Sequence, residues 1–359
     1  MLFIPHKHLY ISGTSYVSAD EPDYKEVITD ANLRRRMGRL LKMAVWCGLK
    51  SLDGVPSERV AGIITSTGAG FMKDTISFGS SIFDREETLL NPSPFMQSTF
   101  NTASGYIALI RKIHAYNTTY VQQADGFAAS LVDAAMLLDD AGEGNVALVG
   151  AFDEVTPEVD VIRQRLGLYR VGDGFLPLGE GAAAFLLSAA MPTDVSESCP
   201  ATEMSARLGG DDGSESDSER DGDANSGFST GPLREYESAS RLCNESGSES
   251  YSEPLYDSGE TSSRSLNCTK DGNAALRFCG LANLSDLPKC AENPIAELFG
   301  INAGVNVISC VDHVESLGAF RSLLPVLLCK LISEQQIPDG YTAIVDDVNE
   351  DGVIVLLHK

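Results

Sequence analysis

Short apolar runs with the character of buried strands alternate with apolar helical stretches along the first 190 residues. The run VAGIITS at residues 60–66 is rich in β-branched residues and has no polar alternation, which is typical of a strand covered on both faces. Alternation of such strands with helices predicts α/β layering. We expect strands at residues 9–17, 60–66, 119–123, 146–150 and 182–188, and helices at 31–52, 99–113 and 126–138.

The same kind of alternation resumes after residue 272 over a shorter length. A repeated strand–helix pattern is compatible with a duplicated fold of five layers in which the second half is reduced. We expect strands at residues 275–281 and 305–310, helices at 293–299 and 317–332, and a closing hairpin at 342–348 and 353–357.

An acidic segment rich in Ser and Gly separates the two parts at residues 192–272. It holds 18 Asp and Glu against 6 Lys and Arg, a net charge of −12, which is half of the −24 of the whole chain. Such a composition buries too little apolar surface to offset the entropy of ordering. We therefore expect three parts, an N-terminal half at 1–191, a disordered insertion at 192–272 and a C-terminal half at 273–359. A specific acidic recognition segment is the alternative for the insertion.

The charge and the apolar runs also exclude several classes of partner. A net charge of −24 argues against nucleic acid and anionic membrane surfaces. No stretch approaches the ~18 apolar residues of a membrane span, and the N-terminus lacks the pattern of a signal peptide. None of the eight cysteines forms a Cys-x-x-Cys pair, so we expect no metal site, and we expect no cofactor. We expect a cytoplasmic protein with reduced thiols.

Four glycine-containing segments occur in a fixed order along the first half. A single glycine turn between a strand and a helix is a weak signal of a protein family, so the inference depends on the order of all four segments. They are AGIITSTGAG at 61–70, SPFMQSTFNTASGYIAL at 93–109, TTYVQQADGFAASLVDAAMLL at 118–138 with NVALVGAFDE at 145–154, and GDGFLPLGEGAAAFLL at 172–187.

These segments resemble the β-ketoacyl synthases of the thiolase superfamily. The last one is similar to the Asp-Gly-Phe…Gly-Glu-Gly-Ala hallmark of that family, and its Glu180 is expected to accept backbone hydrogen bonds. The resemblance implies an α/β fold of the thiolase type, a duplicated α-β-α-β-α arrangement with a reduced C-terminal half. It covers residues 9–188 well and 275–359 weakly.

A condensing ketosynthase needs a cysteine to carry the acyl group, two histidines for the enolate and a glycine-rich loop for the oxyanion. The resemblance places the nucleophile position on Gln123, which cannot form a thioester. No cysteine lies between Cys47 and Cys199, so a shift of register does not supply one. Gln at this position resembles chain length factors, although Asp125 departs from their pattern. A Gln that only satisfies a turn is the alternative reading.

The other active-site positions of the family are also changed. The first histidine position falls on Asn283, and the second falls on Glu315 with His313 two residues upstream. His313 either points into the pocket or is a histidine without a catalytic role. The glycine-rich loop falls on DDVNEDG at residues 346–352, whose four acidic residues oppose a developing oxyanion. The resemblance thus implies an acyltransferase family whose catalytic Cys and His are missing, which leaves enzymatic activity undecided.

The resemblance implies a non-condensing subunit of the chain-length-factor type. Its expected partners are an active ketosynthase and an acyl carrier protein, in fatty acid, polyketide or aryl-polyene synthesis. We expect a heterodimer through the strand from Thr118 to Gln123. The candidate walls of an acyl tunnel are Phe95, Met96, Thr99 and Phe100, and packing into the chain's own core is the alternative for them. The alternative functions are a β-ketoacyl-ACP synthase or a malonyl-thioester decarboxylase that acts alone, and a scaffold with the fold only.

Overall fold

The structure is a computed structural model that describes residues 2–122, 125–142, 144–189, 266–267, 275–289, 291–349 and 352–359. The insertion expected at 192–272 lies outside the described residues except for the short strand β9 (Leu266–Asn267).

The first half contains the predicted strands and helices and three further helices. The single helix expected at 31–52 is divided, because Met37 and Gly38 are extended and the backbone N–H of Gly38 donates to Gln97 Oε1 at 2.6 Å. The elements are β2 (Leu9–Val17), α1 (Ala31–Arg36), α2 (Arg39–Ser51), β3 (Val60–Thr67), α3 (Met72–Asp84), α4 (Pro92–Ser98), α5 (Thr102–Arg111), β4 (Tyr116–Val121), α6 (Asp125–Ala141), β5 (Val146–Asp153), α7 (Pro157–Leu166), β6 (Arg170–Val171), β7 (Gly174–Phe175) and β8 (Gly181–Ser188).

The second half is shorter, and the helix expected at 317–332 is also divided. Gly318, with a φ of 76°, ends the short α9, and α10 starts at Leu323 with Pro325 in its first turn, where proline is tolerated. The elements are β10 (Arg277–Asn283), α8 (Pro294–Leu298), β11 (Val305–Ser309), α9 (Val314–Leu317), α10 (Leu323–Ser333), β12 (Tyr341–Val345) and β13 (Val353–His358). The N-terminal strand β1 (Leu2–Phe3) belongs to the first half of the sequence and pairs with β10.

The sheet shows that the two halves follow one plan. The strand order is β11-β12-β13-β10-β2-β8-β5-β3-β4, and β2 and β10 join the half-sheets where Leu9 and Tyr10 pair with Phe278 and Arg277. In the first half β3 is parallel to β5, β5 is antiparallel to β8, and β8 is antiparallel to β2. In the second half β11, β12, β13 and β10 repeat these relations in the same order. Among the described strands, the second half has no counterpart of the edge strand β4.

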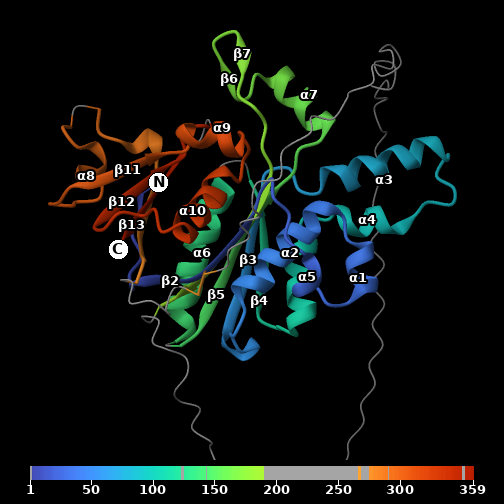
Figure 1. The fold of residues 1–359 in the computed structure, drawn as a ribbon, viewed down its shortest axis with the longest axis horizontal. Helices are drawn as coiled ribbons and strands as arrows, with labels where there is room; N and C mark the ends of the chain where they lie inside the picture. The colour runs from blue at the N-terminus through green and yellow to red at the C-terminus, as the bar shows by residue number, and fades with distance from the viewer. Residues whose placement is uncertain are drawn as a thin grey trace, which may run out of the picture. The chain divides into compact units, whose positions relative to one another are not determined.

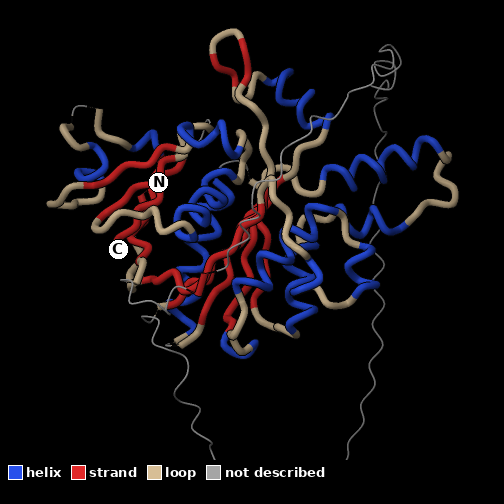
Figure 2. The backbone as a smooth tube through the Cα atoms, in the orientation of Figure 1, coloured by secondary structure: helices blue, strands red, loops and turns tan. Residues whose placement is uncertain are grey.

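Helices and half-sheets alternate in layers, as Figures 1 and 2 show. Three apolar cores lie between these layers. The helices α2 and α5 cover one face of the first half-sheet. The helices α6 and α10 lie between the two half-sheets, and α8 covers the far face of the second. The alternate residues of β5 divide between two cores, with Leu148 against α2 and Val149 in the central core. The predicted α-β-α-β-α arrangement with a reduced second half is therefore confirmed.

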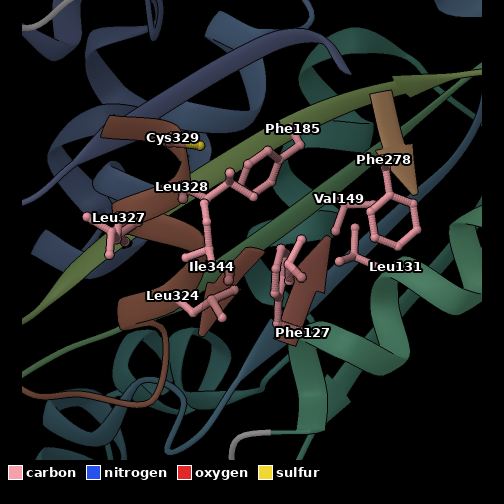
Figure 3. Close-up of a cluster of buried hydrophobic side chains, with 14 of the residues drawn as sticks. Phe127, Leu131, Val149, Phe185, Phe278, Leu324, Leu327, Leu328, Cys329 and Ile344 are labelled. Carbon is pink, nitrogen blue, oxygen red and sulfur yellow. The ribbon is translucent and has the colours of Figure 1, made fainter. Parts of the chain in front are cut away.

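The central core is formed by side chains from both halves. Figure 3 shows Phe127 and Leu131 of α6 in one cluster with Leu324 and Leu328 of α10. The ring of Phe127 lies 5.5 Å from that of Phe185 on β8.

Candidate functional site

Polar side chains gather at the carboxyl ends of β5 and β12, next to the turns that follow β3 and β11. Asp153 is the last residue of β5, and Asp346 directly follows β12. Both carboxyl groups are buried, with exposed fractions of 4% and 2%. A buried carboxylate must be hydrogen-bonded to be tolerated, so its donors identify the elements that form the site.

Asp153 is surrounded by four donors from both halves of the chain. Its Oδ1 accepts from Thr67 Oγ1 at 3.0 Å and from the backbone N–H groups of Gly68 at 2.9 Å and Ala69 at 3.1 Å. Its Oδ2 accepts from Ser322 Oγ at 2.5 Å, just before α10. Burial raises the pKa of Asp153, and these donors oppose that shift. The carboxylate therefore joins the turn after β3 to the start of α10.

A similar arrangement recurs in the second half. The carboxylate of Asp347 accepts from the hydroxyl of Ser309, the last residue of β11, and from the backbone N–H of Val311 at 2.9 Å. Asp346 Oδ1 accepts the backbone N–H groups of Val348 at 3.3 Å and Asn349 at 3.2 Å. Burial raises the pKa of Asp346, while its bonds to Asn349 oppose the shift. The acidic residues of the 346–349 loop thus bind the chain's own donors.

Three further residues connect this loop to the first half. Tyr169 Oη donates to Asn349 Oδ1 at 3.0 Å, and Arg321 Nη1 donates to the same oxygen at 3.4 Å. The Arg321 guanidinium lies 5.9 Å from the centre of the Tyr169 ring. Sequence reasoning gave no role to Asp153, Tyr169, Arg321 and Ser322, and it included Asn349 only as part of the loop at 346–352. The one signal in the sequence was the carboxylate of Asp153, three residues after the strand expected at 146–150.

The predicted nucleophile position lies between a strand and a helix. Strand β4 ends at Val121 and α6 begins at Asp125, while Gln123 itself lies outside the described residues. A Cβ atom on Gly126 would contact Ser66 of β3 at 3.4 Å, so the first turn of α6 starts beside the end of β3. The described residues thus place a strand before this position and a helix after it.

The described cysteines are poor nucleophiles. Cys47, Cys310 and Cys329 are buried and Cys279 is half-buried. Burial raises the pKa of Cys47, Cys279 and Cys310, which disfavours the thiolate that attacks a thioester. Cys310 also lies near Asp346 and Asp347, whose charges raise its pKa further.

The three residues at the predicted histidine positions lie at the end of β10 and around the start of α9. Asn283 ends β10, and the next residue, Leu284, donates its N–H to the carbonyl of Gly352 at 2.8 Å. His313 is half-buried and its backbone N–H binds the carbonyl of Cys310, whereas Glu315 is exposed on α9. Within the described residues, none of the three side chains hydrogen-bonds another. Their roles remain predictions.

The four candidate tunnel residues lie on the surface of this chain, on and just after α4. The exposed fractions are 54% for Phe95, 63% for Met96 and 43% for Phe100, and Thr99 is also exposed. The Phe95 ring lies 5.1 Å from that of Phe78 on α3, and the Phe100 ring covers Gly70. The expected alternative, packing into the chain's own core, therefore does not describe these side chains.

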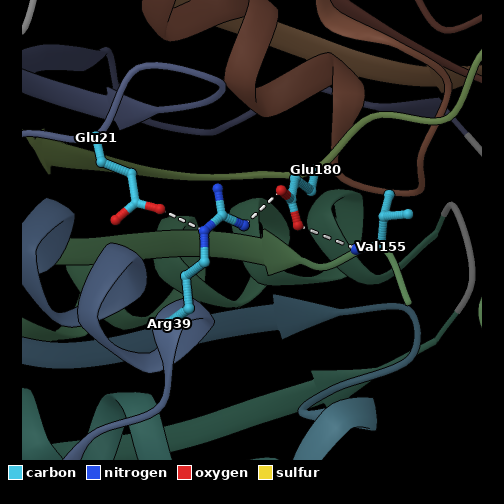
Figure 4. Close-up of polar contacts among 4 residues, drawn as sticks. All are labelled: Glu21, Arg39, Val155 and Glu180. Carbon is cyan, nitrogen blue, oxygen red and sulfur yellow. Dashed lines mark hydrogen bonds and ion pairs between the residues drawn. The ribbon is translucent and has the colours of Figure 1, made fainter. Parts of the chain in front are cut away.

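The hallmark turn before β8 holds a charged network, shown in Figure 4. Glu180 Oε2 accepts the backbone N–H of Val155 at 3.2 Å, as the sequence motif predicts. Its other oxygen forms an ion pair with Arg39 at the start of α2, and Arg39 also pairs with Glu21. Because Val155 follows β5 by two residues, this network anchors the segment next to Asp153.

Among the described residues, no three His, Cys, Asp or Glu side chains are grouped so that they could bind a metal ion. In the same parts of the chain, no helix combines the length and apolar character needed to span a membrane.

Residues 14–174 match the family model described as beta-ketoacyl synthase, N-terminal domain. No curated protein sequence matches the chain.

Several solved structures share the fold over nearly their whole length. The ishigamide ketosynthase/chain length factor matches with a TM-score of 0.57 and 12% identity, covering 98% of this chain and 99% of that one. The AntDE:AntF complex, a type II PKS acyl-carrier protein with its ketosynthase bound to the hexaketide, matches at 0.56 and 13%, covering 98% and 99%. A beta-ketoacyl synthase from Burkholderia phymatum STM815 matches at 0.55 and 11%, covering 98% of each chain. At such identities the likeness concerns the fold.

The matched domain, the duplicated layers and the motif order agree with one another. Residues 14–174 are thus similar to the N-terminal domain of beta-ketoacyl synthases, and the chain has the α/β fold of the solved ketosynthases.

Proposed function

We propose that this chain is the non-condensing subunit of a ketosynthase pair, of the chain-length-factor type. It associates with an active β-ketoacyl-ACP synthase during carrier-protein-dependent elongation of a fatty acyl, polyketide or aryl-polyene chain. The partner supplies the cysteine and histidines, and this subunit shapes the space that receives the growing chain.

The main support for this proposal is the amide residue Gln123 at the expected nucleophile position, in the segment between β4 and α6. Only Gln122, Gln123 and Ala124 lie between the end of β4 and the start of α6. A thiolate nucleophile is favoured at a helix N-terminus, where the helix dipole lowers its pKa. An amide at this position cannot carry an acyl group, and its hydrogen-bonding groups are neutral.

The second half supports the same conclusion. Along the sequence of the first half, the two strands β3 and β4 come between β2 and the central helix α6. Along the described sequence of the second half, one strand, β11, comes between β10 and the central helix α10. Each parallel strand contributes a turn at the site edge of its sheet, so the second half has one site turn fewer. Asp346 and Asp347 occupy backbone donors in the turns that remain.

The partner surface is proposed at the edge of β4, from Thr118 to Gln123. In the described structure β4 pairs only with β3, so its outer edge is free. Apolar side chains are exposed along this edge and on the flanking helices, with Tyr116 and Val121 on β4, Leu109 on α5 and Met136 on α6. An open strand edge beside exposed apolar residues is an aggregation hazard unless a partner covers it.

The candidate carrier-protein surface is a cleft beside α1 in which basic residues outnumber acidic ones. The cleft has a volume of about 340 Å³, and its charged lining is Lys25, Arg34, Arg35 and Lys42 against Glu21 and Asp23. Among the described residues, none of the four basic side chains forms an ion pair, although the chain has 51 acidic against 27 basic residues. Unpaired cations in an acidic chain favour an anionic partner, which is consistent with a phosphate-bearing carrier protein.

Co-expression with a ketosynthase that has an intact Cys-His-His set tests the pairing. We expect a one-to-one complex in size exclusion, with an interface well above ~2,000 Å². Val121→Asp should dissociate it by placing an unpaired charge in the interface. Val307→Asp, an exposed valine on the other edge strand β11, is the matched control. A wild-type chain that stays monomeric at micromolar concentration beside its ketosynthase would refute the pairing.

A further inference from the structure

The outer edge of β11 carries backbone groups that no described strand pairs. Figure 1 shows β11 at the outer edge of the second half, where it is parallel to β12 in an unbroken register. The N–H of Cys310 donates to the carbonyl of Val345 at 2.9 Å, and alternate residues of a strand direct their N–H and C=O groups to opposite sides. The N–H and C=O groups of Val305, Val307 and Ser309 therefore point away from β12.

In the first half, the corresponding strand edge is covered. Strand β3 is the counterpart of β11, because β3 is parallel to β5 as β11 is parallel to β12. The outer neighbour of β3 is β4, which is parallel to it in an unbroken register. Among the described strands, none lies at this position beside β11. The shared plan of the two halves thus includes one strand position whose occupant is not a described part of this chain.

The residues of β11 do not protect this edge against pairing. Open strand edges are commonly protected by charged residues, proline or a bulge. The sequence VNVIS of β11 has no charge and no proline, and its register with β12 shows no shift. Val307 is 57% exposed, and Val311 beyond the strand is 43% exposed. A strand added here would therefore cover apolar side chains as well as pair backbone groups.

Exposed carboxylates lie at the carboxyl end of the same edge. Asp347 accepts hydrogen bonds from Ser309 and from the N–H of Val311, and the exposed Asp312 is the next residue. Neither carboxylate forms an ion pair within the described part of the chain. The segment before the strand, residues 302–304, has no charge. Because the whole chain carries a net charge of −24, this edge repels a second copy and attracts a basic segment.

We propose that the outer edge of β11 is a docking site for an extended, basic segment of another protein, which joins the sheet as an added strand. The N–H and C=O groups of Val305, Val307 and Ser309 bind its backbone, and the Val307 side chain contacts its apolar residues. Asp312 and Asp347 attract its Lys or Arg side chains. In strand addition the main chain supplies affinity and the side chains supply specificity. The β11 edge is at the opposite end of the strand order from β4, so this inference does not depend on the proposed pairing.

Hydrogen exchange of the wild-type chain, measured by NMR, tests the site directly. The probe is a synthetic peptide with the sequence Lys-Thr-Val-Thr-Val-Thr-Lys. In the isolated chain we expect fast exchange at the N–H of Val307 and slow exchange at that of Ile308, which is directed to β12. At about 1 mM peptide, exchange at Val307 should slow about fivefold or more, the effect of one added hydrogen bond, while exchange in β4 is unchanged.

Two outcomes of this measurement would overturn the proposal. Slow exchange at Val307 in the isolated chain would show that a second copy or another part of this chain already covers the edge. Unchanged exchange at Val307 in the presence of the peptide would show that no strand is added.

Variants of Val307 separate backbone pairing from other modes of binding. Val307→Pro removes the outward N–H and no bond to β12, and proline is tolerated in an edge strand when its position faces solvent. We expect it to weaken binding of the fluorescently labelled peptide about tenfold or more. Val307→Thr keeps the N–H and the β-branched shape, so it is the matched control and should retain binding. Equal binding by the Pro and Thr variants would contradict strand addition.

The charge of the peptide tests the class of partner. A peptide with Glu in place of both Lys residues should bind about tenfold more weakly to the wild type at low salt. Asp312→Lys should reduce this preference, because it reverses the charge at the carboxyl end of the edge. Equal affinities of the wild type for the Lys and Glu peptides would exclude a basic segment as the specific partner.

Discussion

Gly179 and Gly318 lie backbone against backbone where the hallmark turn before β8 meets the segment between α9 and α10. A Cβ atom on Gly179 would lie 1.9 Å from the carbonyl oxygen of Leu317, and one on Gly318 would lie 2.3 Å from the nitrogen of Gly179. The N–H of Ala319 donates to the carbonyl of Pro177 at 2.7 Å, and the N–H of Gly179 donates to the carbonyl of Ala319 at 3.2 Å. The two halves are thus joined through main chain that has no room for a side chain.

Substitution at this junction should be strongly destabilising. We expect Gly318→Ala to lower the free energy of unfolding by about 3 kcal/mol or more, because it adds both a clash and a strained positive φ. Gly79→Ala in α3 is the matched control, since a Cβ there meets open space. In a helix this change should add about 0.5–1 kcal/mol of stability. Denaturant unfolding measures both, and equal stabilities of the two variants would contradict the close contact.

The buried carboxyl groups should make stability depend on pH. Burial raises the pKa of Asp153 and Asp346 in the folded state, so the folded chain binds these protons more tightly than the unfolded chain. Their contribution is present at low pH and is lost as the pH rises through the folded-state pKa, above the ordinary carboxyl pKa of about 3.9. In Asp153→Asn, the free energy of unfolding should therefore fall less between acidic and neutral pH than it does in the wild type.

Chemical denaturation at a series of pH values measures this slope. The exposed Asp339→Asn variant controls for the loss of one negative charge. The same slope in Asp153→Asn and wild type would show that this carboxyl group does not titrate with folding.

The aromatic residues on and after α4 should control product length in the complex. Phe95 and Phe100 are exposed on this chain, yet each is held by a defined contact, with Phe78 and Gly70 respectively. Replacement by Ala enlarges the space available to an acyl chain, so Phe95→Ala and Phe100→Ala should shift the products to longer chains. Mass spectrometry of the products measures the shift, and Phe83→Ala, a more exposed phenylalanine, is the control. Unchanged product length in both variants would show that Phe95 and Phe100 do not line the tunnel.

The acidic segment at 192–272 should be the first site of proteolysis. Its composition gives it few apolar side chains to bury, so a protease should reach it before the layered core. Limited proteolysis followed by intact-mass analysis should yield two fragments that remain associated and folded. Uniform digestion across the chain would contradict this expectation.

Much of the fold was predictable from the sequence, because uninterrupted apolar runs such as the one at 60–66 form strands covered on both faces. The breaks within two of the expected helices could not be predicted from the sequence. Gly38 is extended because Gln97, 59 residues away, accepts its N–H, and Gly318 is required by its contact with Gly179. The helix α3 has no buried residue, so its sequence carries a weak pattern of burial.

The site was predictable only where a local motif marks it. Gln123 is placed by the order of the motifs around it. The bond between Asp153 and Ser322 joins residues 169 positions apart, and that between Tyr169 and Asn349 joins residues 180 apart. Such pairs arise from the meeting of the two halves and leave no periodic signal in the sequence.

We expect that this subunit cannot condense acyl units by itself. We also expect that an active ketosynthase needs it in order to elongate a chain. A single-turnover assay with an acyl carrier protein thioester and a malonyl carrier protein tests both expectations most directly, with each subunit alone and with both. We predict elongated product only with both subunits, an acyl adduct on the partner's cysteine, and no adduct on this chain. Elongation should be lost when the partner's cysteine is replaced by Ala and retained in Gln123→Ala. An acyl adduct on this chain, or elongation by this chain alone, would contradict the account.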